Sequence, residues 1–374
     1  MNACVITNNY PSDGDYYKNN FVHSRVKKYI ESGLDVEVFV YSKSHSKEYE
    51  FEGVKVCVGN IEKLRKFVHY KKPQKLLVHF LTRNIINAIS SLDGNYPIIV
   101  WIHGVEALGW YRRLFNFDKY FIKYILSNTL QLIMFRRFVN KKTNVKLIFV
   151  SDWMKKIAEK DASIKINNFE IIPNLVDSHR FSYKEKSIED AKKILIIRPF
   201  SSKKYCTDVI VSSIEELAKD SRFEDYTITI FGDGKLFDKT VAPIRTYKNV
   251  SINKKFLTQE EIKEQHDKHG IFLCPTRQDA QGVSMCEAMS SGLVPITSNS
   301  TAIPEFVKHG ESGYLSDNNP LSIAQYILKL NEDKKEFLNL SKEASRSIRA
   351  KCSEEKTIMK ELDIIKNTVK QMDN

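Results

Sequence analysis

The chain has 374 residues, more than one ordinary hydrophobic core accommodates, which predicts two domains. Its hydrophobic content of 42% and charged content of 28% are typical of a folded globular protein and exclude a disordered one. The sequence has no run of about 18 apolar residues, which excludes a membrane-spanning helix. We expect no signal peptide at the N-terminus, and the six cysteines, which lack metal-binding spacing, are expected to be buried thiols in the cytoplasm.

Strand and helix patterns alternate along the whole chain. In the first half, apolar runs predict strands at 3–7, 36–41, 76–80, 98–102, 145–150 and 170–172. Helical periodicity lies between them, at 21–32, 83–91 and 152–159. The second half predicts strands at 193–197, 226–231, 250–252, 271–274 and 294–297. Its helices are expected at 208–219, 260–269, 283–291 and from about 322 onward.

This alternation predicts two α/β domains in tandem, each built on a doubly wound parallel sheet. We place the first domain at 1–178 and the second at 179–354, with the charged stretch 182–192 as a linker. A C-terminal helix at 355–374 is expected to pack back on the first domain. Ligands of doubly wound sheets bind beyond the carboxyl ends of the strands, so we expect a binding cleft where the two sets of ends face each other.

The net charge of +12 is concentrated in the segment 110–146. This segment holds nine basic residues and one acid, interleaved with many aromatic and aliphatic side chains. Such a composition fits a surface that lies on an anionic membrane. It fits equally well an ordinary core helix whose other face is solvated. Nucleic-acid binding is not favoured, because no helix-turn-helix, zinc or RNP-like pattern is present.

The stretch 274–289 carries the pattern with the most chemical content. It begins at the end of a buried strand, passes Asp279 and Gly282 in a polar loop, and enters a helix that carries Glu287. Gly282 allows the backbone to approach a diphosphate closely, and the N–H groups of Val283 and Ser284 at the helix start are expected to point at it. The carboxylate of Glu287 can accept hydrogen bonds from both hydroxyls of a ribose. Together these features fit a sugar nucleotide.

The same stretch resembles the Glu-x7-Glu signature of the retaining glycosyltransferases of family 4, here as Asp279-x7-Glu287. The sequences Ala288-Met289-Ser290-Ser291-Gly292-Leu293-Val294-Pro295 and Ile303-Pro304-Glu305 follow in the order of that family. The resemblance implies the GT-B fold, with two Rossmann-like domains that face each other across a cleft. It also implies that Asp279 contacts hydroxyls of the donor sugar, although the family has a glutamate at this position.

The family places an arginine and a lysine after the first strand of the second domain, here Arg198 and Lys203, with Lys204 as an alternative to Lys203. Their role there is to bind the diphosphate, whose negative charge grows as it departs. Gly232, at the end of the next strand, is expected either to face the nucleotide base or to form a tight turn.

In the first domain, the resemblance implies that His103 lies beside the donor sugar, and we expect it to position the sugar rather than to transfer a proton. Gly14 stands in place of the family's glycine-rich loop and is expected on the donor side. Glu106 is expected either to reach the acceptor or to cap a helix.

These residues predict a retaining, metal-independent glycosyltransferase that requires no cofactor. The donor is expected to be a nucleotide diphosphate sugar, with a UDP-sugar favoured over GDP-mannose. The acceptor is expected to be a hydroxyl of a lipid-linked or growing glycan in bacterial surface polysaccharide synthesis, such as a capsule or an O-antigen. We expect the protein in the cytoplasm, at the inner face of the membrane. The alternatives are a catalytically silent sugar-nucleotide or polysaccharide-binding protein and a GT-B sugar-nucleotide epimerase.

Overall fold

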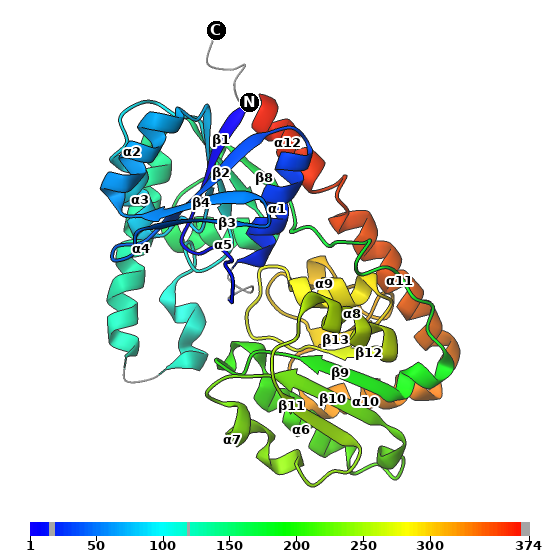
Figure 1. Ribbon diagram of the computed structural model, residues 1–374. Helices are drawn as coiled ribbons and strands as arrows, with labels where there is room; N and C mark the ends of the chain where they lie inside the picture. Colours follow the sequence, from blue (N-terminus) through cyan, green and yellow to red (C-terminus); the bar gives the residue numbers. More distant parts are fainter. Residues whose placement is uncertain (15–18, 118–119, 368–374) are drawn as a thin grey trace. The chain divides into compact units, whose positions relative to one another are not determined.

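A computed structural model describes residues 1–14, 19–117 and 120–367 of the chain (Figure 1). These residues form two compact units, each built around its own sheet. The first unit comprises Met1–Arg112, the stretch that ends at Leu175 and the C-terminal segment from Glu354. The second unit comprises Arg113–Phe117 and Val176–Ser353. The chain therefore passes between the units more than once.

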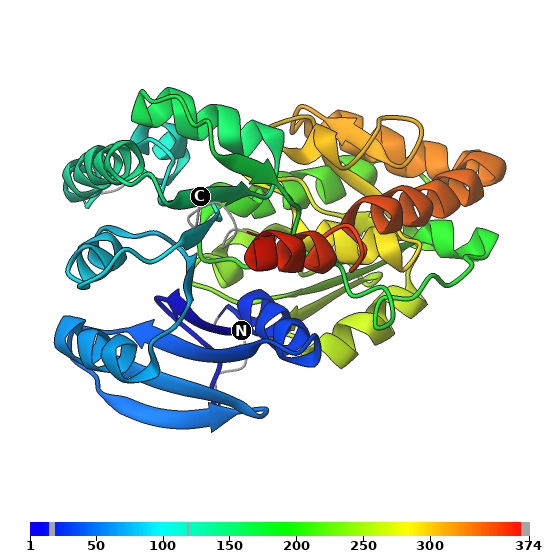
Figure 2. The same cartoon turned by 90° about the horizontal axis from the view of Figure 1, so that it is seen from above.

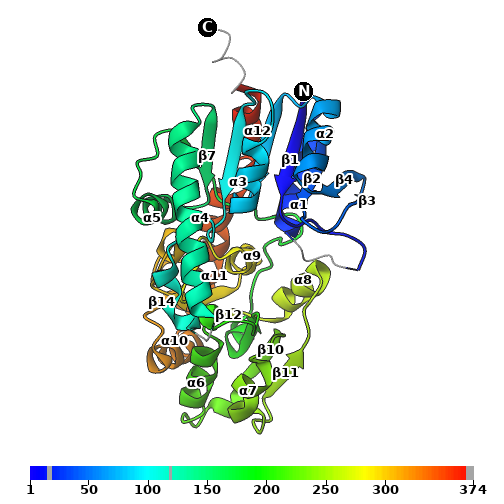
Figure 3. The same ribbon diagram turned by 90° about the vertical axis from the view of Figure 1, so that its left-hand side faces the viewer.

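The first unit has an eight-stranded sheet in the order β3-β4-β2-β1-β5-β6-β7-β8, in which only β3 is antiparallel to its neighbour. The strands are β1 (Asn2–Thr7), β2 (Asp35–Tyr41), β3 (Lys47–Phe51), β4 (Val54–Gly59), β5 (Lys75–His79), β6 (Ile98–Ile102), β7 (Val145–Phe149) and β8 (Phe169–Ile171). The helices are α1 (Asn20–Glu31), α2 (Ile61–Lys71), α3 (Arg83–Ser90), α4 (Phe121–Lys141), α5 (Asp152–Ala162) and α12 (Ile358–Asn367). Figure 3 shows α3 and α4 side by side, and these two helices are in contact.

Helix α12 belongs to the first unit although it follows the second unit in the sequence. It lies beside α1, and Figure 2 shows the red and the blue helix together. Glu361 of α12 is fully buried and accepts hydrogen bonds from Arg25 Nε (3.1 Å), Trp101 Nε1 (2.9 Å) and the Tyr29 hydroxyl. One buried carboxylate thus ties α12 to α1 and β6.

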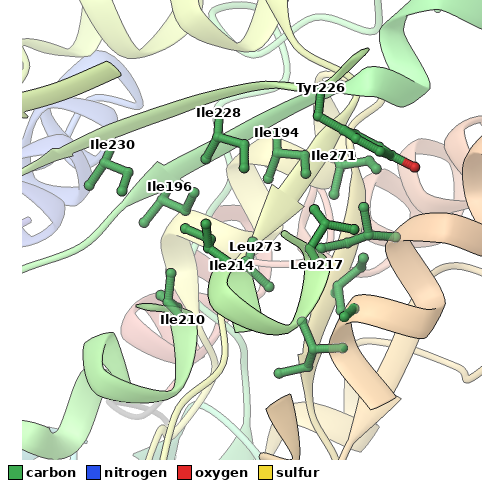
Figure 4. Packing of buried hydrophobic residues seen from close by; sticks show 14 of the residues in the cluster. Ile194, Ile196, Ile210, Ile214, Leu217, Tyr226, Ile228, Ile230, Ile271 and Leu273 are labelled. Carbon is green, nitrogen blue, oxygen red and sulfur yellow. The ribbon is translucent and has the colours of Figure 1, made fainter. Parts of the chain in front are cut away.

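The second unit has a six-stranded parallel sheet in the order β11-β10-β9-β12-β13-β14. Its strands are β9 (Lys193–Ile197), β10 (Thr227–Gly232), β11 (Val250–Lys254), β12 (Ile271–Leu273), β13 (Val294–Ser298) and β14 (Tyr314–Ser316). Its helices are α6 (Thr207–Leu217), α7 (Phe237–Val241), α8 (Gln259–Lys268), α9 (Val283–Ser290), α10 (Pro320–Glu332) and α11 (Lys334–Cys352). Every second residue of the central strands faces the core, where Ile194, Ile196 and Ile228 pack with Ile210 and Ile214 of α6 (Figure 4).

The predicted fold class is confirmed: both units are α/β with mainly parallel sheets. The strands β3, β4 and β14 and the helix α2 were not predicted. The predicted linker 182–192 lies inside the second unit, where Lys186 and Ala191 are buried. The units separate at Leu175 and Val176, whereas we placed the boundary after residue 178. Of the predicted helix 355–374, the structure places a helix at Ile358–Asn367, and residues 368–374 lie outside the described part.

Candidate functional site

The loop between β12 and α9 is stabilised by hydrogen bonds to the side chain of Asp279, which lies in the same loop. Asp279 Oδ1 accepts hydrogen bonds from the backbone N–H groups of Gln281 (3.3 Å) and Gly282 (3.0 Å). Gly282 adopts a left-handed conformation, with φ +81°, and α9 begins directly after it without a side-chain cap. The first N–H groups of α9, at Val283 and Ser284, therefore have no partner within the helix and can bind an anion. Asp279 shapes this turn with one oxygen and keeps a second oxygen for other contacts.

Arg198 follows β9 and is a buried cation. The residue is only 5% exposed, and its Nη2 donates to the carbonyl oxygen of Cys274 at 2.5 Å. In the described part of the chain its Nε has no hydrogen-bond partner and no carboxylate forms an ion pair with it. Burying a charge without a counterion costs on the order of several kcal/mol, and a bound anion would offset this cost. Because β9 and β12 are neighbours, this cation and the loop after β12 belong to the same edge of the sheet.

Glu287 lies on α9, one turn from the start of the helix, between the buried residues Cys286 and Ala288. Its carboxyl has no hydrogen-bond or ion-pair partner among the residues that the structure describes. Burial raises the pKa of this carboxyl to about 8, while Arg180 lowers it and Asp177 raises it further. A carboxyl in such surroundings is stabilised in its charged form by hydroxyl groups that donate to it.

The two other predicted donor-binding residues of this unit are Gly232 and Lys203. Gly232 ends β10 so close to β9 that a Cβ atom there would lie 2.0 Å from the carbonyl oxygen of Arg198. The close packing against the Arg198 carbonyl therefore explains why a glycine is required at position 232. Lys203 is exposed at the start of a 3-10 turn, Lys203–Tyr205, which Ser202 caps. Lys204 is half-buried, with its ammonium group over the ring of Tyr205.

His103 of the first unit follows β6 and is partly exposed. Its Nε2 lies 3.0 Å from Nδ1 of His79, which ends the neighbouring strand β5. Burial, together with the nearby Arg25, holds the pKa of His103 well below its usual range, so its imidazole is neutral. Glu106 is buried and accepts from the backbone N–H of His103 at 2.7 Å. Gly14 is exposed in the turn after β1, with φ +81° and no atom within 4 Å of a Cβ position.

The basic aromatic segment 110–146 forms a 3-10 helix, Trp110–Asn116, followed by α4, with residues 118–119 outside the described part. Phe121, Phe135 and Phe138 of α4 are buried, as the core-helix interpretation expects. The opposite face is not polar, however, because Ile122 and Leu126 are 70% and 68% exposed. We name this surface the α4 face; it holds the exposed residues Ile122, Leu126, Leu130 and Ile133, and at its end Arg136, Arg137 and Lys141.

The structure thus groups the predicted residues by unit. Arg198, Gly232 and the loop with Asp279 and Gly282 lie at the carboxyl ends of β9, β10 and β12. Sequence reasoning missed His79 and Arg180. His79 could have been found, since it lies at the end of a predicted strand next to the strand that leads to His103. Nothing in the sequence distinguishes Arg180 from the chain's other basic residues.

Comparison with known proteins agrees with this arrangement. Residues 177–347, almost the whole second unit, match the family described as Glycosyl transferases group 1. The structure of HepE from Anabaena in complex with UDP-glucose superposes with a TM-score of 0.72 at 14% identity, over 99% of this chain and all of that one. The chain has the GT-B fold.

Two curated proteins are similar in sequence, each at 27% identity. One is N-acetyl-alpha-D-glucosaminyl L-malate synthase of Bacillus anthracis, matched over 47% of this chain and 45% of its own length. The other is the amylovoran biosynthesis glycosyltransferase AmsK of Erwinia amylovora, matched over 42% of this chain and 40% of its own length. The chain thus spans less than half the length of the curated relatives that it matches.

Proposed function

We propose that the protein is a retaining glycosyltransferase that transfers a sugar from a nucleotide diphosphate donor to a hydroxyl group. The observation that carries the proposal is Arg198, a buried cation without a carboxylate partner in the described chain, at the sheet edge where α9 also begins. A diphosphate supplies the missing negative charge. The similarity of this unit to Glycosyl transferases group 1 supports the same reaction class.

The roles of the residues follow from charge and hydrogen bonding. Arg198 and Lys203 stabilise the charge that grows on the leaving diphosphate, and the N–H groups at the start of α9 add to this effect. Glu287 accepts from the ribose hydroxyls, and the second oxygen of Asp279 accepts from a sugar hydroxyl. In the proposed reaction the bond from the anomeric carbon to the diphosphate breaks, and the acceptor oxygen attacks the same face of the sugar. The acceptor proton passes to the departing phosphate oxygen, and Arg198 and Lys203 supply the charge stabilisation that a metal ion would otherwise supply.

We propose a UDP-sugar as the donor and a lipid-linked or growing surface glycan as the acceptor. The first part is supported by HepE, which was solved with UDP-glucose. The second is supported by the similarity to AmsK, a glycosyltransferase of amylovoran biosynthesis. A hydroxyl acceptor that is not a glycan, as the name of the Bacillus anthracis protein suggests for that protein, is the alternative within the same reaction class.

A thermal-shift panel of UDP, GDP, TDP and their sugars tests the donor site, because a ligand that binds the folded protein raises its melting temperature. We expect UDP and UDP-sugars to give the largest shifts and Arg198→Ala and Glu287→Ala to abolish them. Arg222→Ala, which removes a half-buried arginine of the same unit that pairs with Asp220, is the control and should leave the shifts unchanged. A panel in which no nucleotide raises the melting temperature refutes the proposal.

Turnover assays separate the transferase from its two alternatives. Incubation of the preferred UDP-sugar with a lipid-linked glycan should release UDP and form a glycoside with the anomeric configuration of the donor. Donor binding without UDP release from any acceptor would indicate a silent binding protein. Conversion of the donor to an isomeric sugar nucleotide without an acceptor would indicate an epimerase.

We also propose that the α4 face lies on an anionic membrane, where a lipid-linked acceptor is found. Its apolar residues follow one stripe of the helix, at positions 122, 126, 130 and 133, and the basic residues Arg136, Arg137 and Lys141 continue that stripe. Apolar side chains that insert between lipids and cations that contact headgroups are the two components of interfacial binding. No helix among the described residues is long and apolar enough to span a membrane.

Co-sedimentation with vesicles that contain about a third phosphatidylglycerol tests this surface. We expect the double variant Leu126→Glu, Leu130→Glu to remain in the supernatant while it still binds UDP. Leu321→Glu changes a similarly exposed leucine of α10 and should sediment as the wild type does. Equal sedimentation of all three proteins would refute membrane binding through α4.

A further inference from the structure

His79 and His103 form a pair whose geometry is that of a hydrogen bond between two imidazoles. His79 Nδ1 lies 3.0 Å from His103 Nε2, and the two rings are inclined by only 16°. Both the N–H bond and the lone pair of an imidazole lie in the plane of its ring. In nearly coplanar rings the N–H of one ring therefore points at the lone pair of the other. One of these two nitrogens therefore carries the shared proton.

The surroundings of His79 decide which nitrogen carries it. His79 is fully buried, and its Nε2 has no hydrogen-bond partner among the described residues. Burial also holds the pKa of His79 well below its usual range, so the ring is neutral and has a single proton. If His79 carried that proton on Nε2, a buried N–H donor would be left without an acceptor, which is rarer in proteins than an unpaired acceptor. The proton of His79 therefore belongs on Nδ1, from which it is donated to His103.

We propose that His79 is a positioning residue that fixes His103 in the tautomer protonated at Nδ1. Since Nε2 of His103 accepts from His79, the free nitrogen of His103 is a hydrogen-bond donor. His103 is partly exposed, and its Nδ1 makes no hydrogen bond within the described chain, so this donor is available to a ligand. The inference deepens the proposed function: the Nδ1–H of His103 can donate a hydrogen bond to an oxygen of a bound substrate, and His103 cannot take up the acceptor proton.

The backbone and the aromatic neighbours hold the pair in place. The Trp101 ring stacks on His79 at 4.7 Å, and the rings of Phe21 and Phe80 pack against His103 at 4.9 Å and 4.6 Å. Phe80 has φ +60°, an unfavourable backbone conformation for an aromatic residue. Strained residues cluster at functional sites, where their geometry serves the site.

Nuclear magnetic resonance of the full chain with 15N-labelled histidine tests the tautomer directly. The nitrogens of His103 are identified as the signals that disappear in His103→Asn. We expect the wild type at neutral pH to carry its proton on Nδ1 of His103, and we expect His79→Asn to preserve this state, because an asparagine amide can donate from the position of Nδ1. In His79→Leu we expect the signals of both tautomers. Protonation of His103 at Nε2 in the wild type, or an unchanged tautomer in His79→Leu, overturns the proposal.

The transferase assay gives the second readout. We expect kcat to fall roughly tenfold or more in His79→Leu, the loss that one hydrogen bond to the substrate accounts for, with KM for the donor nearly unchanged. His79→Asn should retain kcat within about threefold. His266→Leu removes a buried histidine of the second unit together with its hydrogen bond to Ser291, and it reports the effect of the same kind of substitution away from His103. Equal kcat in His79→Leu and the wild type overturns the proposal, whereas a wild type without transferase activity refutes the proposed function and leaves the tautomer measurement to decide the role of His79.

Discussion

The raised pKa of Glu287 makes donor binding depend on pH. In the protein without ligand, burial raises the pKa of this carboxyl to about 8, so most molecules carry a neutral Glu287 at pH 7. Hydroxyl groups of a ribose donate to the ionised carboxylate, and binding therefore has to remove its proton. The change of pH from 8 to 6 is the perturbation, and UDP-glucose is the probe because its diphosphate does not titrate in this range.

The size of the effect follows from the pKa. If only the ionised form of Glu287 binds the ribose, each pH unit below about 8 weakens binding about tenfold, or about 1.4 kcal/mol. Between pH 8, where half of the carboxyls are ionised, and pH 6, the dissociation constant should rise about 50-fold. The same shift affects stability with a defined sign. The folded protein binds more protons than the unfolded chain between about 4.5 and 8, so the free energy of unfolding without ligand falls as pH rises through this window.

Isothermal titration calorimetry in two buffers of different ionisation enthalpy measures both quantities. At pH 7 we expect release of nearly one proton per bound UDP-glucose, and a dissociation constant that falls from pH 6 to 8. In Glu287→Gln, which keeps a hydrogen-bonding side chain but does not titrate, the affinity should be constant over this range. A wild-type affinity that is independent of pH, or a pH dependence that survives in Glu287→Gln, would refute the reasoning.

Three further variants test other parts of the structure. Glu361→Ala leaves Arg25 buried without its carboxylate and should lower the free energy of unfolding by roughly 3–5 kcal/mol in urea denaturation, whereas a loss below 1 kcal/mol would contradict the role of this pair. Gly234→Ala places a Cβ 2.5 Å from the backbone of the loop after β9 and should weaken UDP binding in a thermal-shift assay; unchanged binding would indicate that the loop can yield. Burial lowers the pKa of Lys186 from 10.5 to about 8, so the free energy of unfolding should rise between pH 8 and 10.5. Urea denaturation at these two pH values measures the rise, and Lys186→Met should remove it.

The fold was predictable where strands are central and apolar. Runs such as Ile98–Ile102 are buried on both faces of a parallel sheet and therefore read as continuous hydrophobic segments. The strand β3 was not predicted because it is an antiparallel edge strand, and its residues, Lys-Glu-Tyr-Glu-Phe, are mostly exposed. The stretch 182–192 was predicted to be a linker because its composition is charged. Lys186 is nevertheless buried, and it donates a hydrogen bond to the carbonyl oxygen of His266, a long-range contact that the local sequence cannot reveal.

The sequence named candidate site residues but could not indicate their contacts. The family resemblance implied that Arg198 binds an anion, and the structure adds that this cation has no carboxylate partner in the described chain. The sequence could not indicate that Asp279 bonds the backbone of its own turn, nor that Glu106 accepts from the backbone of His103. The pair of His79 and His103 depends on the neighbouring positions of β5 and β6, which follow from the order of the strands in the sheet.

The place of α12 in the first unit has a consequence for how the protein is made. The N-terminal part of the first unit leaves the ribosome long before α12, which follows the whole second unit in the sequence. Until α12 emerges, Arg25, Tyr29 and Trp101 have no Glu361 to bond, and the surface that α12 covers stays open to water. The second unit, a nearly continuous segment, can fold as soon as it is synthesised. We therefore expect the unit that begins the chain to be the one that finishes folding last.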